Sequence, residues 1–110
     1  MPYWAALLIL LCAAILEATG DALMRKGIFS DALGRRSLLM LCGGLILTAY
    51  GYVVNVAPWD FGRLLGVYVA ILFAVAQVTA WILFGQGPTV AMLTGGILII
   101  AGGWVVSLGK

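Results

Sequence analysis

Glu17 stands inside an apolar stretch that runs from Tyr3 to Met24, where nearly every neighbour would be at home in hydrocarbon. An ionisable side chain at membrane depth costs about 3 kcal/mol or more, and it marks a candidate functional site. Asp21 follows four residues later, on the same face of a helix. No Lys, Arg or His occurs at a comparable depth in any apolar stretch, so Glu17 has no internal cation to neutralise it.

A carboxyl group without a cation in apolar surroundings favours its protonated form. Once the proton leaves, the carboxylate attracts a cation, so a proton and a cationic ligand would compete for Glu17. The small residues Ala13 and Gly20 leave room beside this segment, and we interpret them with Asp21 as candidate pocket residues. This is the chemistry of coupled transport. For Asp21, a hydrated carboxylate near the basic residues that follow explains the position equally well.

The composition indicates the class of protein that positions this carboxylate. The chain has 110 residues, of which 65% are hydrophobic and 9% charged, whereas an ordinary soluble domain is about 25% charged. A membrane-spanning helix takes about 20 apolar residues, and four such stretches cover residues 3–24, 37–56, 64–84 and 91–108. They lack the strict alternation of a membrane β-barrel. We therefore predict an all-α integral membrane protein with one four-helix transmembrane domain over residues 1–110.

The third stretch adds three polar candidates. Tyr68 and Gln77 lie within it and could face a ligand, although hydrogen bonding between helices explains Gln77 equally well. Arg63 lies at its mouth, where an Arg commonly anchors a helix at the interface. The alternative for Arg63 is contact with a headgroup or phosphate, because the guanidinium fork matches phosphate oxygens.

Glycines in the second and fourth stretches predict close helix packing. Gly95, Leu98 and Gly102 form one stripe, which we interpret as a seam between two subunits. A four-helix chain has little interior in which to enclose a pathway alone, so we expect a dimer. For Gly43 and Gly44, packing within the subunit and packing between subunits are equally plausible.

Basic residues predict the orientation in the membrane only weakly. Four flank the first loop, whereas two, Arg63 and Lys110, lie toward the other side. The side with more Lys and Arg is usually cytoplasmic. A difference this small is compatible with insertion both ways round, which would permit an antiparallel homodimer, or with one orientation beside a paralogous partner.

The first stretch resembles the Small Multidrug Resistance (SMR) family of the drug/metabolite transporter superfamily. That family carries a membrane-embedded Glu, a Gly three residues on and a Leu-Met-Lys/Arg exit, and this chain reads Glu17-Ala-Thr-Gly20-Asp-Ala-Leu23-Met24-Arg25. Its last hairpin is similar to Trp81-Ile-Leu-Phe84-Gly85-Gln86 followed by Gly95-Gly-Ile-Leu98. The third stretch departs from the family pattern: the family Tyr falls on Leu65 and the family Trp on Tyr68.

The resemblance implies a multi-pass protein of the bacterial inner membrane that works as an antiparallel dimer. Two copies of Glu17 would line one chamber and exchange protons for a small cationic or hydrophobic-cation substrate by alternating access. The fourth helices would form the seam. The changed third stretch puts the export of polyaromatic drugs in question.

Two other functions are compatible with the sequence. One is a flippase for a polyprenyl-phosphate-linked sugar or another lipid, with Arg63 on the phosphate, and the other is an accessory membrane subunit that transports nothing itself. We do not expect an enzyme, because the chain has no His and no nucleophile paired with a base. No metal or cofactor is predicted. Nucleic-acid binding is not predicted either, since a net charge of +2 spread over loop ends is no basic stripe.

Overall fold

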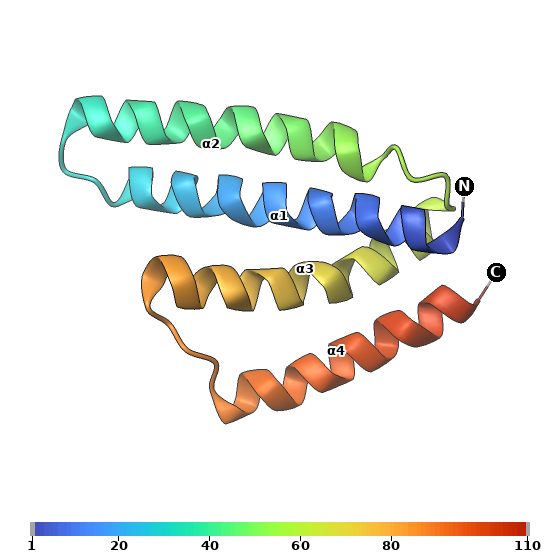
Figure 1. Cartoon of the computed structure of the whole chain (residues 1–110). Coiled ribbons are helices and arrows are strands. Elements are labelled where there is room, and N and C mark those ends of the chain that lie inside the picture. The colour runs from blue at the N-terminus through green and yellow to red at the C-terminus, as the bar shows by residue number, and fades with distance from the viewer. Residues whose placement is uncertain (1, 110) are drawn as a thin grey trace.

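The computed structural model describes residues 2–109 and contains four α-helices joined by short loops (Figure 1). All four are long and apolar enough to cross a membrane, which confirms the prediction of a four-helix membrane protein. The helices are α1 (Tyr3–Ile28), α2 (Leu33–Val54), α3 (Phe61–Phe84) and α4 (Val90–Leu108). Lys110, one of the basic residues used to predict orientation, lies outside the described residues.

The helix ends differ from the predicted ones mainly around the first loop. α1 continues to Ile28 and α2 already begins at Leu33, so Gly27 and Gly34, which lie between the first two predicted stretches, are helical. Gly27 stays in the helix because it packs against α2: a Cβ there would lie 2.8 Å from Cγ of Met40. The packing of Met40 against Gly27 stabilises the helix at this point and offsets the low helix propensity of glycine. The loop itself is therefore short.

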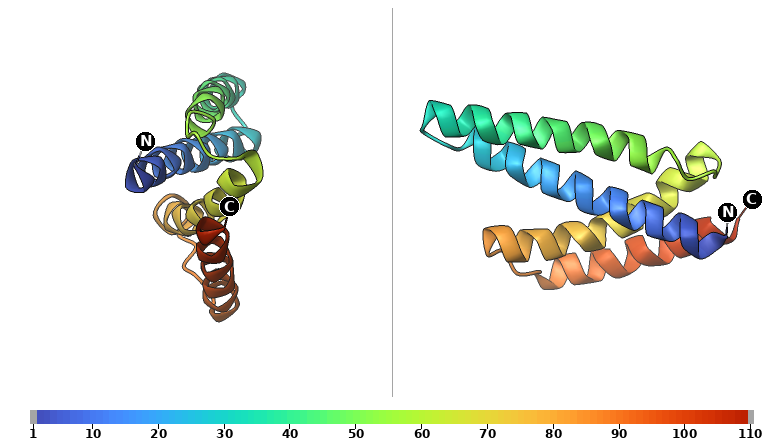
Figure 2. Two further views of the ribbon diagram at one scale, coloured as in Figure 1. Left: turned by 90° about the vertical axis from the view of Figure 1, so that its right-hand side faces the viewer. Right: turned by 45° about the horizontal axis from the view of Figure 1, so that its top comes forward.

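The helices pack in the order α2, α1, α3, α4 rather than in chain order (Figure 2). α1 contacts both α2 and α3, and α4 contacts α3 alone. Within residues 2–109, α2 and α3 make no close backbone approach. Residues 55–60 are long enough to carry α3 past α2 and onto α1, which places α1 between α2 and α3.

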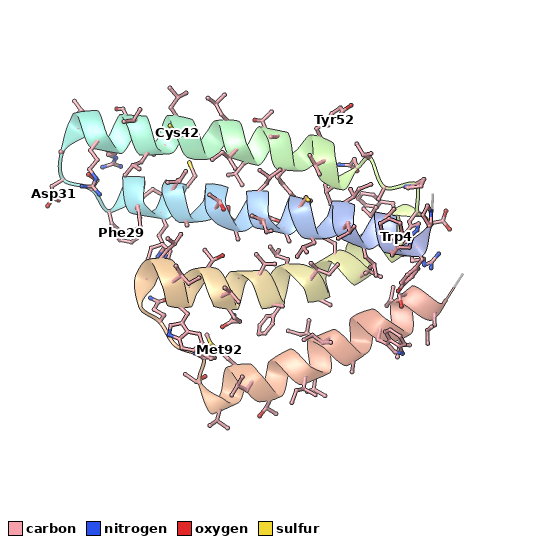
Figure 3. The ribbon with its side chains drawn as sticks, in the orientation of Figure 1. Trp4, Phe29, Asp31, Cys42, Tyr52 and Met92 are labelled. Carbon is pink, nitrogen blue, oxygen red and sulfur yellow. The ribbon has the colours of Figure 1, made fainter. Side chains whose placement is uncertain are left out.

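Both chain ends lie at the same end of the bundle, opposite the α1–α2 turn (Figure 1). Aromatic residues gather at this end: the Tyr3 ring centroid lies 5.4 Å from that of Trp59, and Trp4 is exposed nearby (Figure 3). Amphipathic rings of this kind are enriched at the two membrane interfaces. Tyr3, Trp4 and Trp59 therefore lie where an aromatic belt at one membrane interface is expected.

The core lies where α1 meets α3. Its buried residues come largely from these two helices, and α1 contributes small ones: Ala13 and Ala14 are fully buried against larger side chains such as Leu10 and Leu64. Small residues let the backbones of membrane helices approach closely, and that approach provides the packing contacts that stabilise helices in lipid. The contact between α1 and α3 also brings Glu17 and Tyr68 together, as described below.

Gly43 and Gly44, for which packing within one chain and packing between two chains were equally plausible, differ in the structure. A Cβ at Gly43 would lie 2.9 Å from the Gly20 carbonyl oxygen, whereas a Cβ at Gly44 would meet nothing within 4 Å. Gly43 thus packs within the subunit against α1, and Gly44 faces away from the other helices. The two neighbours form a matched pair for a stability test.

We expect Gly43→Ala to destabilise the protein and Gly44→Ala to be neutral or stabilising. The Gly20 carbonyl belongs to the backbone and cannot turn aside, so α1 and α2 must separate at a cost of about 1–3 kcal/mol. At Gly44 the methyl group only improves helix propensity. Unfolding of the purified protein by SDS in mixed micelles gives both values. Equal stabilities for the two variants would contradict this packing.

Candidate functional site

Glu17 lies near the middle of α1, 14 residues after Tyr3 and 11 before Ile28. Its Oε1 accepts a hydrogen bond of 2.7 Å from the hydroxyl of Tyr68 on α3. Tyr68 is 3% exposed, and Glu17 is partly buried. The two residues are 51 positions apart in sequence, so the α1–α3 contact alone brings them together. A carboxylate predicted from α1 and a candidate pocket residue predicted from α3 form one site.

Tyr50 extends this site onto α2. Its ring stacks on that of Tyr68 with centroids 5.8 Å apart and planes at 27°, and its hydroxyl lies near the Glu17 carboxylate. Three helices therefore contribute to a cluster of one carboxylate and two phenols. Sequence analysis missed Tyr50, because α2 is apolar on all sides and its pattern does not tell which face meets α1.

The hydroxyl of Tyr68 suits either protonation state of Glu17. A phenol both donates and accepts hydrogen bonds, so it can donate to a carboxylate and accept from a carboxylic acid. An Arg or Lys in the same place would donate only and would hold the acid ionised. Within residues 2–109 the hydrogen bonds of the structure give Glu17 this neutral partner and no basic one. The partner of Glu17 is therefore a neutral group that can donate or accept a hydrogen bond.

A cavity of about 420 Å³ begins one helical turn from the Glu17–Tyr68 bond. Asp21, four residues after Glu17, lines it from α1, and Leu72, four residues after Tyr68, lines it from α3. Small apolar residues make up much of the remaining wall, and Arg25, Gln86 and Thr79 are its polar members. The Thr79 hydroxyl already donates to the Val75 carbonyl oxygen. This volume falls in the range of small-molecule sites, about 300–1,000 Å³.

The other predicted pocket residues lie elsewhere. Gly20 faces α2, where a Cβ would lie 2.8 Å from Cγ of Leu47, and Ala13 is fully buried in the core. Neither lines the cavity of about 420 Å³, because helices pack on both small residues in the single chain. Their interpretation as pocket residues stays a prediction. Gln77 lines a different groove, of about 290 Å³, between α3 and α4. Of the five predicted pocket residues, Asp21 and Tyr68 lie close to Glu17.

Arg63 is held by the protein itself. Its Nη2 donates a 2.8 Å hydrogen bond to the Ser107 carbonyl oxygen in the last turn of α4, and its guanidinium lies 4.7 Å from the ring centroid of Trp59. The last carbonyls of a helix have no partner within the helix, so Arg63 satisfies one of them. Arg63 therefore links the start of α3 to the end of α4. The contact of Arg63 with a headgroup or phosphate stays a prediction.

We expect Arg63→Gln to loosen the last turn of α4. A hydrogen bond from a charged donor contributes about 1.5–3 kcal/mol, and partial exposure reduces that to about 1 kcal/mol. Hydrogen–deuterium exchange should therefore speed up severalfold in residues 104–108. The control is Arg36→Gln, which removes an exposed Arg. Unchanged exchange in the Arg63 variant would contradict the link.

The residues of the predicted subunit seam lie on the outer side of α4. A Cβ at Gly95 or at Gly102 would meet nothing within 4 Å, and Leu98 is 70% exposed. Their neighbours Gly96 and Gly103 face inward instead, with Cβ positions 2.7 Å from Phe73 and 2.6 Å from Ala70. One face of α4 thus packs on α3, and the predicted stripe is free of contacts within the subunit.

Comparison with known proteins gives no match: no family model, no curated protein and no solved structure matches this chain.

Proposed function

We propose that the protein is a proton-coupled secondary transporter for small cationic compounds. The observation that carries the proposal is the Glu17–Tyr68 pair: a carboxylate midway along a membrane-spanning helix whose hydrogen-bond partner is a neutral hydroxyl. An unpaired ionisable group at this depth is expensive and is retained where ions or protons move. The partner permits both protonation states, as coupling requires.

Coupling follows from competition at Glu17. When Glu17 is protonated, the site is neutral and no charge holds a cation there. When the proton leaves, the carboxylate attracts the cation, while the Tyr68 hydroxyl supplies one hydrogen bond to the charged oxygen. A site that holds either ligand but not both exchanges them if it opens alternately to the two sides. Protons moving inward would thereby drive cations outward.

The cavity beside Glu17 supports a cationic substrate of modest size. Asp21 contributes a carboxylate to its wall and Phe84 an aromatic ring, whereas Arg25, in the last turn of α1, contributes a positive charge at one end. A carboxylate and a ring face both attract organic cations. The apolar remainder of the wall would accommodate hydrocarbon substituents, so the substrate class is a small hydrophobic cation such as a quaternary ammonium.

A dimer would complete the transport pathway. One chain forms an open row of four helices with α1 central and α4 at the edge (Figure 2), so a chamber closed to lipid needs a second chain. The free stripe of Gly95, Leu98 and Gly102 suits the seam. The resemblance of the Glu17 segment to the SMR family supports the same assembly: an antiparallel homodimer, or a heterodimer with a paralogue, in a bacterial inner membrane.

Electrical recording on proteoliposomes tests the proposal. Purified protein is reconstituted and exposed on a solid-supported membrane to quaternary ammoniums, guanidiniums and cationic metabolites under a proton gradient. We expect transient currents with at least one class and none with empty liposomes. The absence of current with every cation, together with transfer of a fluorescent polyprenyl-phosphate lipid between leaflets, would replace this proposal with the flippase alternative. Absence of both activities would favour an accessory subunit.

A further inference from the structure

A second cavity, of about 540 Å³, lies at the opposite end of the bundle from the chain termini. Three basic side chains line it: Arg25 and Lys26 from the last turn of α1, and Arg35 from the first turn of α2. Ser30 in the turn and Gln86 after α3 add neutral polar groups. Residues from three helices and two loops thus converge on one basic cavity, although none of them takes part in the Glu17–Tyr68 pair.

No carboxylate lines this basic cavity. The cations rest on aromatic rings instead: the Arg25 guanidinium lies 5.2 Å from the ring centroid of Phe29, and the Lys26 ammonium lies 5.4 Å from that of Phe84. A ring face holds a cation in place but does not use up its N–H donors as a carboxylate would. Asp31 lies at the outer edge of the turn (Figure 3) and is not part of the lining.

This chemistry fits a phosphate group. Two guanidinium forks offer paired donors to phosphate oxygens and an ammonium adds a compact charge, while the Ser30 hydroxyl and the Gln86 amide supply neutral donors. Phe29 is 72% exposed beside these groups. The cavity lies at the ends of membrane-spanning helices, which is the level of lipid headgroups. An exposed ring next to cations there suits a phosphate that carries an acyl or other apolar part.

We propose that the basic cavity of Arg25, Lys26 and Arg35 binds a phosphate group, supplied by an anionic lipid or by a soluble phosphate compound. The site goes beyond the transport proposal and does not depend on it. It borders the Glu17 cavity, because Arg25, Phe84 and Gln86 line both. A bound phosphate would neutralise Arg25 at the mouth of a cavity proposed for cations.

Native mass spectrometry of the purified full-length protein in detergent tests the site. The probes are phosphatidylglycerol, zwitterionic phosphatidylcholine and, in a separate arm, inorganic phosphate. The variant Arg25→Gln/Arg35→Gln removes two guanidinium forks from the cavity. Arg36→Gln is the matched control, since Arg36 neighbours Arg35 on α2 and does not line the cavity. Circular dichroism checks that every variant keeps its helices, and Lys26→Gln serves if the double variant does not fold.

We expect the wild type and Arg36→Gln to retain one anionic probe, phosphatidylglycerol or inorganic phosphate, in preference to phosphatidylcholine, whose choline neutralises its phosphate. The double variant should retain that probe about tenfold less. Loss of phosphatidylglycerol identifies an anionic lipid, and loss of inorganic phosphate alone identifies a soluble source; both support the site. Equal retention by the double variant would overturn it, because the probe would then not need the guanidinium groups of this cavity. An equal loss in Arg36→Gln would overturn it too, because binding would then follow net charge alone. Equal binding of phosphatidylcholine would overturn it as well.

Discussion

Glu17→Gln is expected to abolish substrate-driven proton movement while the four-helix fold stays intact. Gln has nearly the shape of Glu, and its amide oxygen can still accept the hydrogen bond from Tyr68. It cannot gain or lose a proton and carries no charge for a cation. Currents driven by substrate in reconstituted proteoliposomes should therefore fall to the level of empty liposomes. Circular dichroism and thermal unfolding should match the wild type.

The control for this variant is Asp31→Asn, which makes the same chemical change at an exposed loop position. We expect wild-type currents from it, because Asp31 lies outside the Glu17 cavity and its lining. Wild-type currents from Glu17→Gln would refute the role of this carboxylate in coupling. Loss of current in both variants would show that removing a carboxylate elsewhere in the chain also abolishes transport, so the effect would not be specific to Glu17.

Tyr68→Phe is expected to weaken cation binding without unfolding the protein. The phenol is the donor of the 2.7 Å hydrogen bond to Glu17. A hydrogen bond to a charged group contributes about 1.5–3 kcal/mol. Without it, the ionised form of Glu17, which holds the cation, becomes less favourable by a factor of about 10 to 100. The ring that stacks on Tyr50 stays in place, which preserves the packing of α3. Substrate affinity, measured by calorimetry at one pH, should fall by about tenfold or more.

Tyr52→Phe provides the matched control for the loss of a phenol. Tyr52 lies on α2 like Tyr50, yet it is 77% exposed and points away from the other helices (Figure 3). Its variant should bind substrate as the wild type does. An unchanged affinity in Tyr68→Phe, or the same fall in both variants, would contradict a specific role for the Tyr68 hydroxyl.

Sequence reasoning predicted the elements well because hydrocarbon imposes a simple requirement on them. Spanning helices need long apolar stretches, and these are visible in the composition alone. The ends were less predictable: α1 runs four residues beyond the predicted Met24, to Ile28. Glycine is a weak stop signal when a partner helix packs on it, and whether a partner packs on Gly27 is a tertiary property.

The site was predicted in part. Glu17 was identified by its chemistry, since a charge is conspicuous in an apolar stretch, and Tyr68 by its position in the third stretch. Gly20, only three residues from Glu17, faces α2 instead. Helices that are apolar on every side give little signal for their rotation, so sequence does not tell which side of α1 meets which neighbour. Tyr50 was missed for the same reason.

Proton release on substrate binding tests most directly whether Glu17 is the shared site. The purified protein is held in weakly buffered detergent solution with a pH-indicator dye, and a cation that gives currents in proteoliposomes is added. Competition at Glu17 predicts that the wild type releases protons as it binds, and that Glu17→Gln releases none. Binding by the wild type without any proton release, or equal release by Glu17→Gln, would contradict the account.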